Sequence, residues 1–460
     1  MQEYIRSIEK QLLFWKDKDD RKPMILRGAR QTGKSTIIRK FGEQFDYFIE
    51  LNLERGEDAS HFDKEDSVKK IYESISLQHK VNLKVGQTLL LFIDEIQERP
   101  KAIQLLRYFW EDLPHIHVVA AGSLLEFALG EVKQFPVGRI EYLYMHPFNF
   151  LEFLEAEGNP KLLEEFLKIP VSTVAHDLLI ERFNRFCIIG GMPEVVKRYY
   201  TDGDMTRIRS VYNSIWNTYK SDVEKYAANK TDLQIMRHIL RTALVYMDQR
   251  ITFQNFGNSN YRSREVGEAF RHLDAAGLIR LIYPTTSYDT PPLVDYKKSP
   301  RLQFLDTGIV NNTIGIQSEL IPMKDLSNAF RGALIPHMIT QELLSLNKED
   351  EERPAFWVRD KAQSSAEIDL VYRYNSLLIP IEIKSGSTGS MKSLHYFINH
   401  VDHNFAVRIY GGKFSIEEHK TPEGKYFKLM NLPYYLGTLI PEYIEYFIEK
   451  NKRSLVFDKK

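Results

Sequence analysis

The sequence has a single cysteine, no formal net charge and no long apolar segment, and each of these shortages excludes a class of protein. With only Cys187 among 460 residues, neither an internal disulfide nor a thiolate metal cluster can form, and we expect this residue to be buried and apolar. No apolar run approaches the roughly 18 residues that span a bilayer. These shortages predict a cytoplasmic protein without a membrane partner.

Positive and negative charges balance, because the chain has 62 lysine and arginine residues and 62 aspartate and glutamate residues. Any affinity for nucleic acid therefore has to come from a local basic patch. The composition, 43% hydrophobic and 27% charged, is that of a globular chain, and its length is enough for two to four domains.

The N-terminal third alternates between helix-like and strand-like segments, which predicts an α/β fold with a parallel sheet. The helix-like segments are 1–20 and 67–77, and the strand-like segments are 24–27, 45–53, 88–97 and 116–123.

The segment from Met24 to Ile38 reads as a short buried strand, a glycine-bounded loop and the start of a helix. The loop pattern Gly-x-x-x-x-Gly-Lys-Ser predicts a phosphate cradle in which backbone N–H groups face the phosphates, Lys34 neutralises the outer ones and the Ser35 hydroxyl reaches Mg²⁺. An ordinary glycine turn before a helix is the simpler interpretation. The residues predicted to bind ATP are Gly28, Ala29, Arg30, Gln31, Thr32, Gly33, Lys34, Ser35 and Thr36.

A second apolar run, Thr88 to Gln97, contains the pair Asp94-Glu95, as expected of a buried parallel strand whose carboxyl end opens onto a ligand. Asp94 is predicted to hold the Mg²⁺ shell and Glu95 to polarise the attacking water. Terminal acids that merely face solvent are the alternative.

Two further residues are candidates for sensing or stabilising the nucleotide. Ser123 ends the strand 116–123, where it can contact the terminal phosphate or simply cap the next helix. Arg139 lies in a Gly-Arg loop and can stabilise phosphoryl-transfer charge, on its own nucleotide or on that of a neighbouring subunit, or be a solvated surface group.

The middle of the chain is predicted to be helical from 148 to about 230, forming a lid over the nucleotide core. The Gly190-Gly191 pair interrupts it, and the sequence leaves open whether this is a hinge or a packing corner.

Residues 231–300 follow the order of a winged helix-turn-helix. Between Arg237 and Arg301 ten Lys/Arg face six Asp/Glu, a local positive excess that favours DNA as a partner. A winged module used only for packing is the alternative. The residues expected on the outer face of the second helix are Tyr261, Arg262, Arg264 and Arg271.

Two strands joined by a short turn are predicted in the last third, at Glu367–Tyr372 and Leu377–Gly386. Asp369 and Glu382 would project together from these neighbours. Two such carboxylates can hold Mg²⁺ while Lys384 orients a water, and Glu342 on the helix 338–346 can add a third carboxylate. A polar strand face with a solvated ion pair is the alternative.

Together these stretches resemble a bacterial and archaeal family of AAA-type P-loop ATPases with a winged helix and a C-terminal domain of unknown function that has a restriction-endonuclease-like core. The Pro-Asp of that nuclease superfamily is Ile368-Asp369 here. The segments that carry the resemblance are GARQTGKST at 28–36, FIDEIQ at 92–97, AGSL at 121–124, GR at 138–139, GGMPEVV at 190–196, FLDTG at 304–308, RGAL at 331–334, QELL at 341–344, FWVR at 356–359, AEIDLV at 366–371 and PIEIKSG at 380–386.

The resemblance implies a parallel-sheet nucleotide-binding core with a helical lid, a winged helix-turn-helix and a mixed α/β nuclease-like domain, in that order. The predicted divisions are 1–150, 151–230, 231–300 and 301–460.

Two functions are compatible with these motifs. The first is a Mg²⁺-dependent ATPase that engages DNA and has an active nuclease-like domain; the second is a nucleotide-switched DNA- or protein-binding module whose last domain is catalytically inactive. Both require ATP and Mg²⁺, and both are compatible with a homo-oligomer. They differ in whether Asp369, Glu382 and Lys384 surround a reactive metal.

Overall fold

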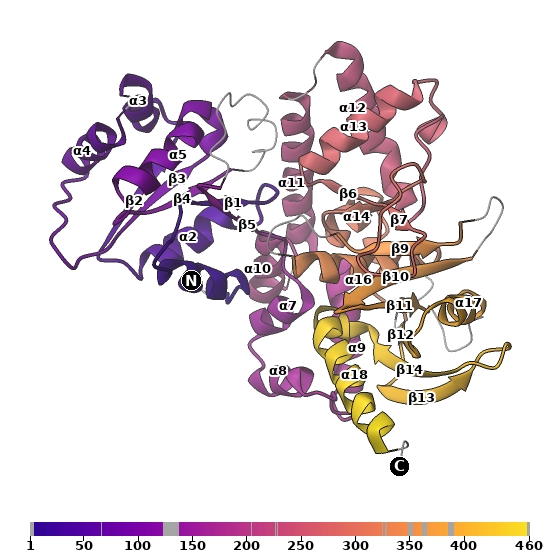
Figure 1. Cartoon of the computed structure of the whole chain (residues 1–460). Coiled ribbons are helices and arrows are strands. Elements are labelled where there is room, and N and C mark those ends of the chain that lie inside the picture. Colours follow the sequence, from indigo (N-terminus) through magenta and orange to yellow (C-terminus); the bar gives the residue numbers. More distant parts are fainter. Residues whose placement is uncertain are drawn as a thin grey trace. The chain divides into compact units, whose positions relative to one another are not determined.

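The computed structural model divides the chain into two compact units, and we describe each by itself (Figure 1). The first unit holds Met1–Pro147 and the second holds most of Phe148–Lys460. The residues that the structure describes are 4–65, 67–122, 138–203, 205–225, 227, 229–323, 325–326, 329–347, 353–360, 366–384 and 391–457.

The first unit is built on a five-stranded sheet in the order β2-β3-β4-β1-β5, in which every pair is parallel. Its elements are α1 (Ile8–Lys16), β1 (Met24–Arg27), α2 (Lys34–Gly42), β2 (Tyr47–Asn52), α3 (Gly56–Lys64), α4 (Val68–Gln78), β3 (Leu89–Asp94), η1 (Ile96–Glu98), α5 (Pro100–Asp112), β4 (His117–Ala121) and β5 (Glu141–Tyr144).

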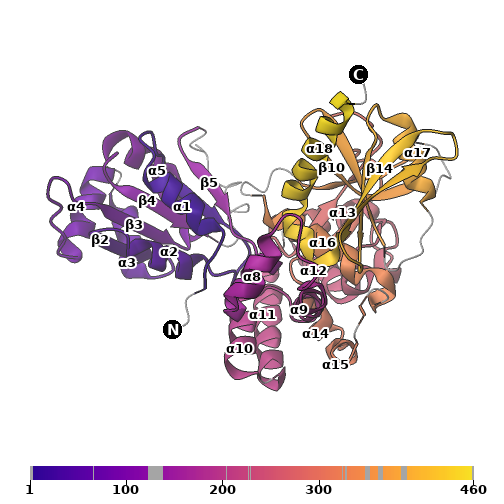
Figure 2. The ribbon, with the colours of Figure 1, turned by 90° about the horizontal axis from the view of Figure 1, so that it is seen from below.

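Helices cover both faces of this sheet, and Figure 2 shows the strands lying between them. Successive strand residues point to opposite faces. Thus Leu91 and Ile93 of β3 pack with α3, α4 and α5, while Leu90 and Phe92 pack with α1 and α2. Burial on both sides explains why β3 reads as a continuous apolar run.

The strands predicted from the sequence at 24–27, 45–53, 88–97 and 116–123 are confirmed as β1, β2, β3 and β4. The parallel α/β fold class is confirmed with them. The helices α3 and α5 and the edge strand β5 were not predicted.

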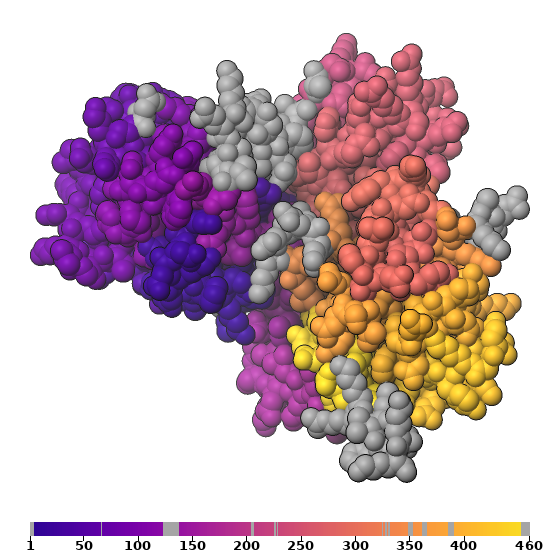
Figure 3. Space-filling view, in the orientation of Figure 1, coloured from indigo at the N-terminus to yellow at the C-terminus, as the bar shows by residue number. Residues whose placement is uncertain are grey.

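The second unit starts with helices and ends with a mixed sheet. Figure 3 shows segments far apart in the sequence, coloured from magenta to yellow, side by side on its surface. Its elements are α7 (Phe150–Glu157), α8 (Pro160–Leu167), α9 (His176–Ile189), α10 (Pro193–Asp202), α11 (Met205–Lys225), α12 (Lys230–Thr242), η2 (Ala243–Tyr246), η3 (Phe256–Asn258), α13 (Ser263–Ala275), β6 (Ile279–Ile282), β7 (Pro284–Thr285), β8 (Arg301–Phe304), α14 (Thr307–Thr313), α15 (Gln317–Leu320), η4 (Ala329–Gly332), α16 (Leu334–Ser345), β9 (Ala355–Val358), β10 (Glu367–Tyr374), β11 (Leu377–Ile383), α17 (Lys392–His400), β12 (Phe405–Tyr410), β13 (Ser415–Lys420), β14 (Tyr426–Pro433), η5 (Tyr434–Leu439) and α18 (Ile440–Phe457).

The mixed sheet has the order β13-β14-β12-β11-β10-β9-β7. On one face it buries Trp357 and Leu378 against Leu394 and Phe397 of α17. The two strands predicted to carry the C-terminal carboxylates are confirmed as β10 and β11, which run antiparallel.

Strand pairing crosses the division predicted at residue 300. The short strand β7 precedes this position but joins the mixed sheet beside β9, whereas β8 follows it but pairs with β6 in a separate two-stranded sheet. The prolines after Thr285 therefore lie in the loop between β7 and β8. Each of these two strands pairs with a strand of the other predicted domain. The division into lid, winged and nuclease-like domains stays a prediction.

The Gly190-Gly191 pair forms a packing corner against Asp306. One carboxylate oxygen of Asp306 accepts a hydrogen bond from Gly191 N at 2.6 Å and the other accepts one from Ile309 N at 2.9 Å, where Asp306 caps α14. A Cβ on Gly190 would lie 2.3 Å from this carboxylate. The motifs at 190–196 and 304–308 thus meet in one buried structure.

None of the helices in the described part of the chain is both long enough and apolar enough to span a bilayer.

Close packing at the Gly190-Gly191 corner predicts that one added methyl group lowers the stability of the second unit. A Cβ on Gly308 would lie 1.8 Å from the Ile189 carbonyl oxygen, so Gly308→Ala forces the α9 and α14 backbones apart. We expect a loss of about 1–3 kcal/mol or more, since overpacking costs this much. Thermal unfolding followed by circular dichroism measures it. Gly56→Ala is the control, because a Cβ on Gly56 meets nothing within 4 Å; equal melting of both variants would contradict the close approach.

Candidate functional site

The loop between β1 and α2 has backbone angles that suit glycine at both ends. Gly28 has φ +138° and Gly33 has φ +96°, and a Cβ on Gly28 would lie 2.3 Å from the Met145 carbonyl oxygen. Gly33 is the N-cap of α2, with no side chain to bond the first N–H groups of the helix. These groups remain available to an anion, and the helix dipole favours one there.

Lys34 is folded back onto its own loop. Its ammonium donates hydrogen bonds to the Gly28 and Ala29 carbonyl oxygens, each at 2.9 Å. Burial lowers the pKa of Lys34 to about 8, while Glu95 and Asp94 oppose this shift. A nucleotide phosphate is a stronger hydrogen-bond acceptor than a carbonyl oxygen. A bound phosphate can therefore replace the Gly28 and Ala29 carbonyl oxygens as the partner of the Lys34 ammonium.

Ser35 and Asp94 come together although they are far apart in the sequence. The Ser35 hydroxyl donates a hydrogen bond of 2.7 Å to Asp94 Oδ2, and Asp94 Oδ1 accepts one of 3.0 Å from Glu95 N. Burial raises the pKa of Asp94 above its usual range. A hydroxyl next to a buried carboxylate fits Mg²⁺, which prefers hard oxygen ligands together with nucleotide phosphates. When bound, Mg²⁺ would neutralise charge on those phosphates.

Glu95 directly follows β3 with φ +52°, a left-handed conformation that is uncommon outside glycine. Its carboxylate accepts a hydrogen bond of 2.5 Å from Gln97 Nε2. In the sheet, β4 lies between β1, which leads into the phosphate loop, and β3, which Glu95 follows.

The other two predicted catalytic residues in the first unit have different outcomes. Ser123 lies outside the described residues. Arg139 Nη1 pairs with Glu111 at 3.1 Å, and its guanidinium lies over the Trp110 ring at 5.0 Å.

Arg139 precedes β5, which runs parallel to β1 with Glu141 beside Met24, whereas the phosphate loop follows the other end of β1. This arrangement favours a role toward a neighbouring subunit over one within its own site. Both roles of Arg139 stay predictions.

Sequence reasoning missed Arg6, which contacts the phosphate loop directly. Its guanidinium donates hydrogen bonds to the Thr32 carbonyl oxygen at 3.1 Å and to the His146 carbonyl oxygen at 2.7 Å, and only 6% of the residue is exposed. No local pattern marks it, because arginine ahead of an amphipathic helix usually faces solvent.

In the second unit the structure brings together Asp369, Glu382 and Lys384 as predicted. Asp369 and Glu382 lie one residue beyond the paired residues Leu370 and Ile381, on neighbouring strands. The Lys384 ammonium hydrogen-bonds to Glu382 Oε1, and burial together with Asp369 raises the pKa of Glu382 to about 7.

Glu342 does not join them, which corrects the prediction of a third carboxylate. Its two oxygens accept hydrogen bonds from Phe150 N at 3.1 and 3.2 Å, at the start of α7. Burial raises the pKa of Glu342 to about 8, against the effect of that N–H. Within the described ranges, no group of three or more His, Cys, Asp or Glu side chains is arranged to hold a metal.

Family models match three successive parts of this chain. The first describes an AAA domain and matches residues 20–154, the part of the chain that carries Lys34, Ser35 and Asp94. The other two are domains of unknown function: DUF8612 at residues 180–320, which crosses the divisions predicted at 230 and 300, and DUF4143 at residues 331–435.

A search of curated proteins found no relative of this chain. Among solved structures, the chain is similar to a STAND signal-transduction ATPase with a tetratricopeptide repeat sensor from Pyrococcus horikoshii, at 10% identity and a TM-score of 0.29, with 75% of this chain and 48% of that one covered. It is also similar to Hsp104 in its closed state with ATPyS and FITC casein, at 12% identity and a TM-score of 0.27, with 62% and 52% covered. The chain thus spans about half the length of both.

The contacts of Arg6 predict that it positions the phosphate loop. In Arg6→Gln the Thr32 carbonyl loses its charged donor, and we expect ATP affinity to fall about tenfold, the equivalent of one charge-assisted hydrogen bond. Isothermal titration with Mg·ATP measures the loss. The control is Lys16→Gln at the end of α1, where the ammonium donates to the Gln44 carbonyl oxygen in an exposed contact. Equal affinity of the two variants would assign Arg6 to packing alone.

Proposed function

We propose that the chain is a Mg²⁺-dependent ATPase in which the first unit binds and hydrolyses ATP. The observation that carries this proposal is the hydrogen bond from Ser35 to Asp94, because it joins a hydroxyl and a carboxylate that can both bind Mg²⁺ beside the phosphate loop. The match to an AAA domain over residues 20–154 supports it independently.

Each residue has a separate task in this proposal. Lys34 leaves the Gly28 and Ala29 carbonyls to neutralise the outer phosphates, Ser35 and Asp94 hold Mg²⁺, and Glu95 accepts the proton of the attacking water. Arg139 acts on the nucleotide of a neighbouring subunit, so that full turnover requires a homo-oligomer.

The proposal predicts that binding and turnover separate between two variants. Lys34→Ala should lose ATP binding, because the other cation of the loop, Arg30, is paired with Glu54 at 3.6 Å. Glu95→Gln should bind ATP while turnover falls about 10²-fold or more, the contribution of a general base. Equilibrium ATP binding and phosphate release measure the two effects. Glu98→Gln, an exposed acid three residues further on, is the control; parent-like hydrolysis by both Lys34→Ala and Glu95→Gln would rule out this site.

We infer in addition that the second unit engages duplex DNA through α13. The order α12, α13, β6 and β8 is that of a winged helix-turn-helix, with β6 and β8 as an antiparallel pair. Arg264 and Arg271 lie seven residues apart on α13 and are exposed, and the Arg264 side chain, 89% exposed, forms an ion pair of 3.0 Å with Glu268. A helix with arginines on its outer face suits a groove lined by phosphates.

The DNA proposal predicts a change in salt dependence. Replacing both Arg262 and Arg264 with Glu should weaken duplex binding and reduce the slope of log K against log salt by about one unit for each phosphate that these side chains would neutralise. Fluorescence anisotropy at several salt concentrations measures the slope. Arg107→Glu is a matched control, because Arg107 forms the same kind of i,i+4 ion pair with Glu111 on α5. An unchanged slope would contradict DNA binding through α13 and would indicate that the winged module serves only in packing.

The proposal has two forms, according to whether the C-terminal carboxylates hold a reactive metal. The meeting of Asp369, Glu382 and Lys384 supports the form that cleaves nucleic acid. The hydrogen bonds around these same carboxylates support the form that only binds.

A further inference from the structure

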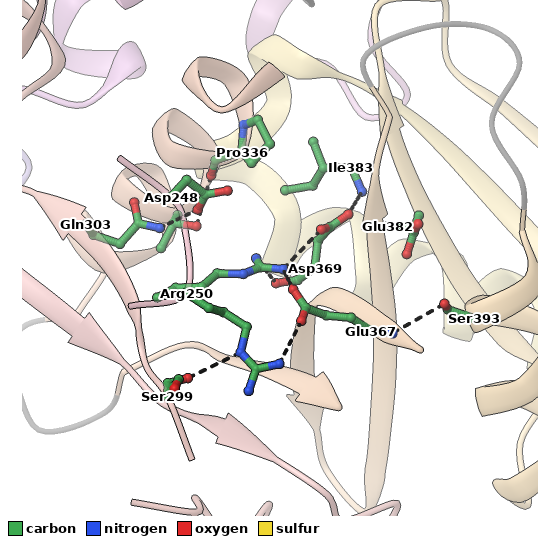
Figure 4. A network of polar contacts seen from close by, with 12 residues as sticks. Asp248, Arg250, Ser299, Gln303, Pro336, Glu367, Asp369, Glu382, Ile383 and Ser393 are labelled. Atoms are coloured by element: carbon green, nitrogen blue, oxygen red, sulfur yellow. Dashed lines mark hydrogen bonds and ion pairs between the residues drawn. The ribbon is translucent and has the colours of Figure 1, made fainter. Parts of the chain in front are cut away.

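The carboxylates of β10 and β11 share their surroundings with a buried arginine. We call Glu367, Asp369 and Glu382 the acidic cluster. Figure 4 shows Asp369 and Glu382 coming from neighbouring strands and Glu367 pointing toward Arg250. The Arg301 guanidinium bonds Glu367 Oε1, the Asp369 carbonyl oxygen at 3.0 Å and Asp369 Oδ1 at 3.3 Å.

Most carboxylate oxygens of the acidic cluster already have a protein partner. Asp369 Oδ2 accepts a hydrogen bond of 2.8 Å from Ile383 N, so both oxygens of Asp369 are engaged. Glu382 Oε1 is bonded by Lys384, and among the oxygens of the acidic cluster Glu382 Oε2 is the one buried without a partner in the described part of the chain. Mg²⁺ in proteins is bound through one or two carboxylates, and the acidic cluster offers one buried carboxylate oxygen that no protein group already occupies.

Arg301 is held in this position by its backbone and its ring contact. It lies on β8, where it pairs with Ile282 of β6, and its guanidinium lies over the Phe356 ring at 4.6 Å. Only 7% of its side chain is exposed. The guanidinium is therefore shielded from solvent where it contacts the acidic cluster.

The charges near the acidic cluster are close to balanced without a metal. Its three acids face Arg301, Lys384 and Arg250, whose Nη1 lies 3.5 Å from Glu367 Oε2. A fourth acid, Asp248, is held through Oδ1 by the Gln303 amide at 2.5 Å. A divalent ion would place excess positive charge in a buried site, which is costly.

We propose that the Arg301 guanidinium is the resident cation of the acidic cluster and excludes a divalent metal from Asp369 and Glu382. The C-terminal domain is then a binding domain in which an internal ion pair takes the place that a metal has in a nuclease. This inference goes beyond the ATPase proposal and does not depend on it, since it concerns only the second unit.

The test counts Mn²⁺ ions on the nucleotide-free full chain by electron paramagnetic resonance. The unsubstituted chain and Asp369→Asn should bind the same number of Mn²⁺ ions, because neither has a site at the acidic cluster. A Mn²⁺ site that Asp369→Asn removes would overturn the proposal. Any weak binding at Ser35 and Asp94 is common to both proteins and cancels in the comparison.

Removing the guanidinium should create the missing site. Arg301→Gln should gain one Mn²⁺ ion, and the double variant Arg301→Gln/Asp369→Asn should lose it again. The matched control is Arg250→Gln, which removes the more exposed arginine from Glu367 and should gain none. A folded Arg301→Gln without an added ion would overturn the claim that this arginine excludes the metal. If Arg301→Gln does not fold, the comparison of the unsubstituted chain with Asp369→Asn decides.

Discussion

The hydrogen bond between Ser35 and Asp94 is the interaction on which the first unit depends, because it joins the start of α2 to the end of β3. Parallel strands bring their carboxyl ends to one edge of the sheet, and both the phosphate loop and the acidic strand end lie there. The covering helices are needed to keep Asp94 buried beside Ser35. In the ATPase that we propose, the fold thus forms the site for a phosphate and a hard cation before either binds.

The second unit uses buried charge in a different way. Asp306 joins two distant turns by accepting backbone N–H bonds, and Arg301 joins the small β6-β8 sheet to the acidic cluster of the mixed sheet. Removing either partner would leave a buried charge without compensation, which is strongly destabilising. Such contacts stabilise the packing of the second unit. A catalytic site, in contrast, needs charged groups that are free to bind a metal or a substrate.

Much of the first unit could be predicted from the sequence, since periodicity marks β1 to β4 and the Gly-x-x-x-x-Gly-Lys-Ser spacing marks the loop. In the second unit the strands β10 and β11 were found, but the partner of Glu342 was not. The helix that carries Glu342 was predicted correctly, yet nothing in the sequence shows that its carboxylate accepts a hydrogen bond from Phe150 N. The contacts of Arg6 and Arg301 were missed for the same reason. A buried arginine is recognised by its tertiary partners, and local patterns carry no information about them.

The central claim, that the β1-α2 loop and the end of β3 form an ATP site, is tested most directly by hydrogen–deuterium exchange of the full chain with and without Mg²⁺ and a nonhydrolysable ATP analogue. The account predicts slower exchange at the amides of residues 28–36, which would face the phosphates, and at 94–95. Exchange at these amides that is unchanged by saturating analogue would contradict it.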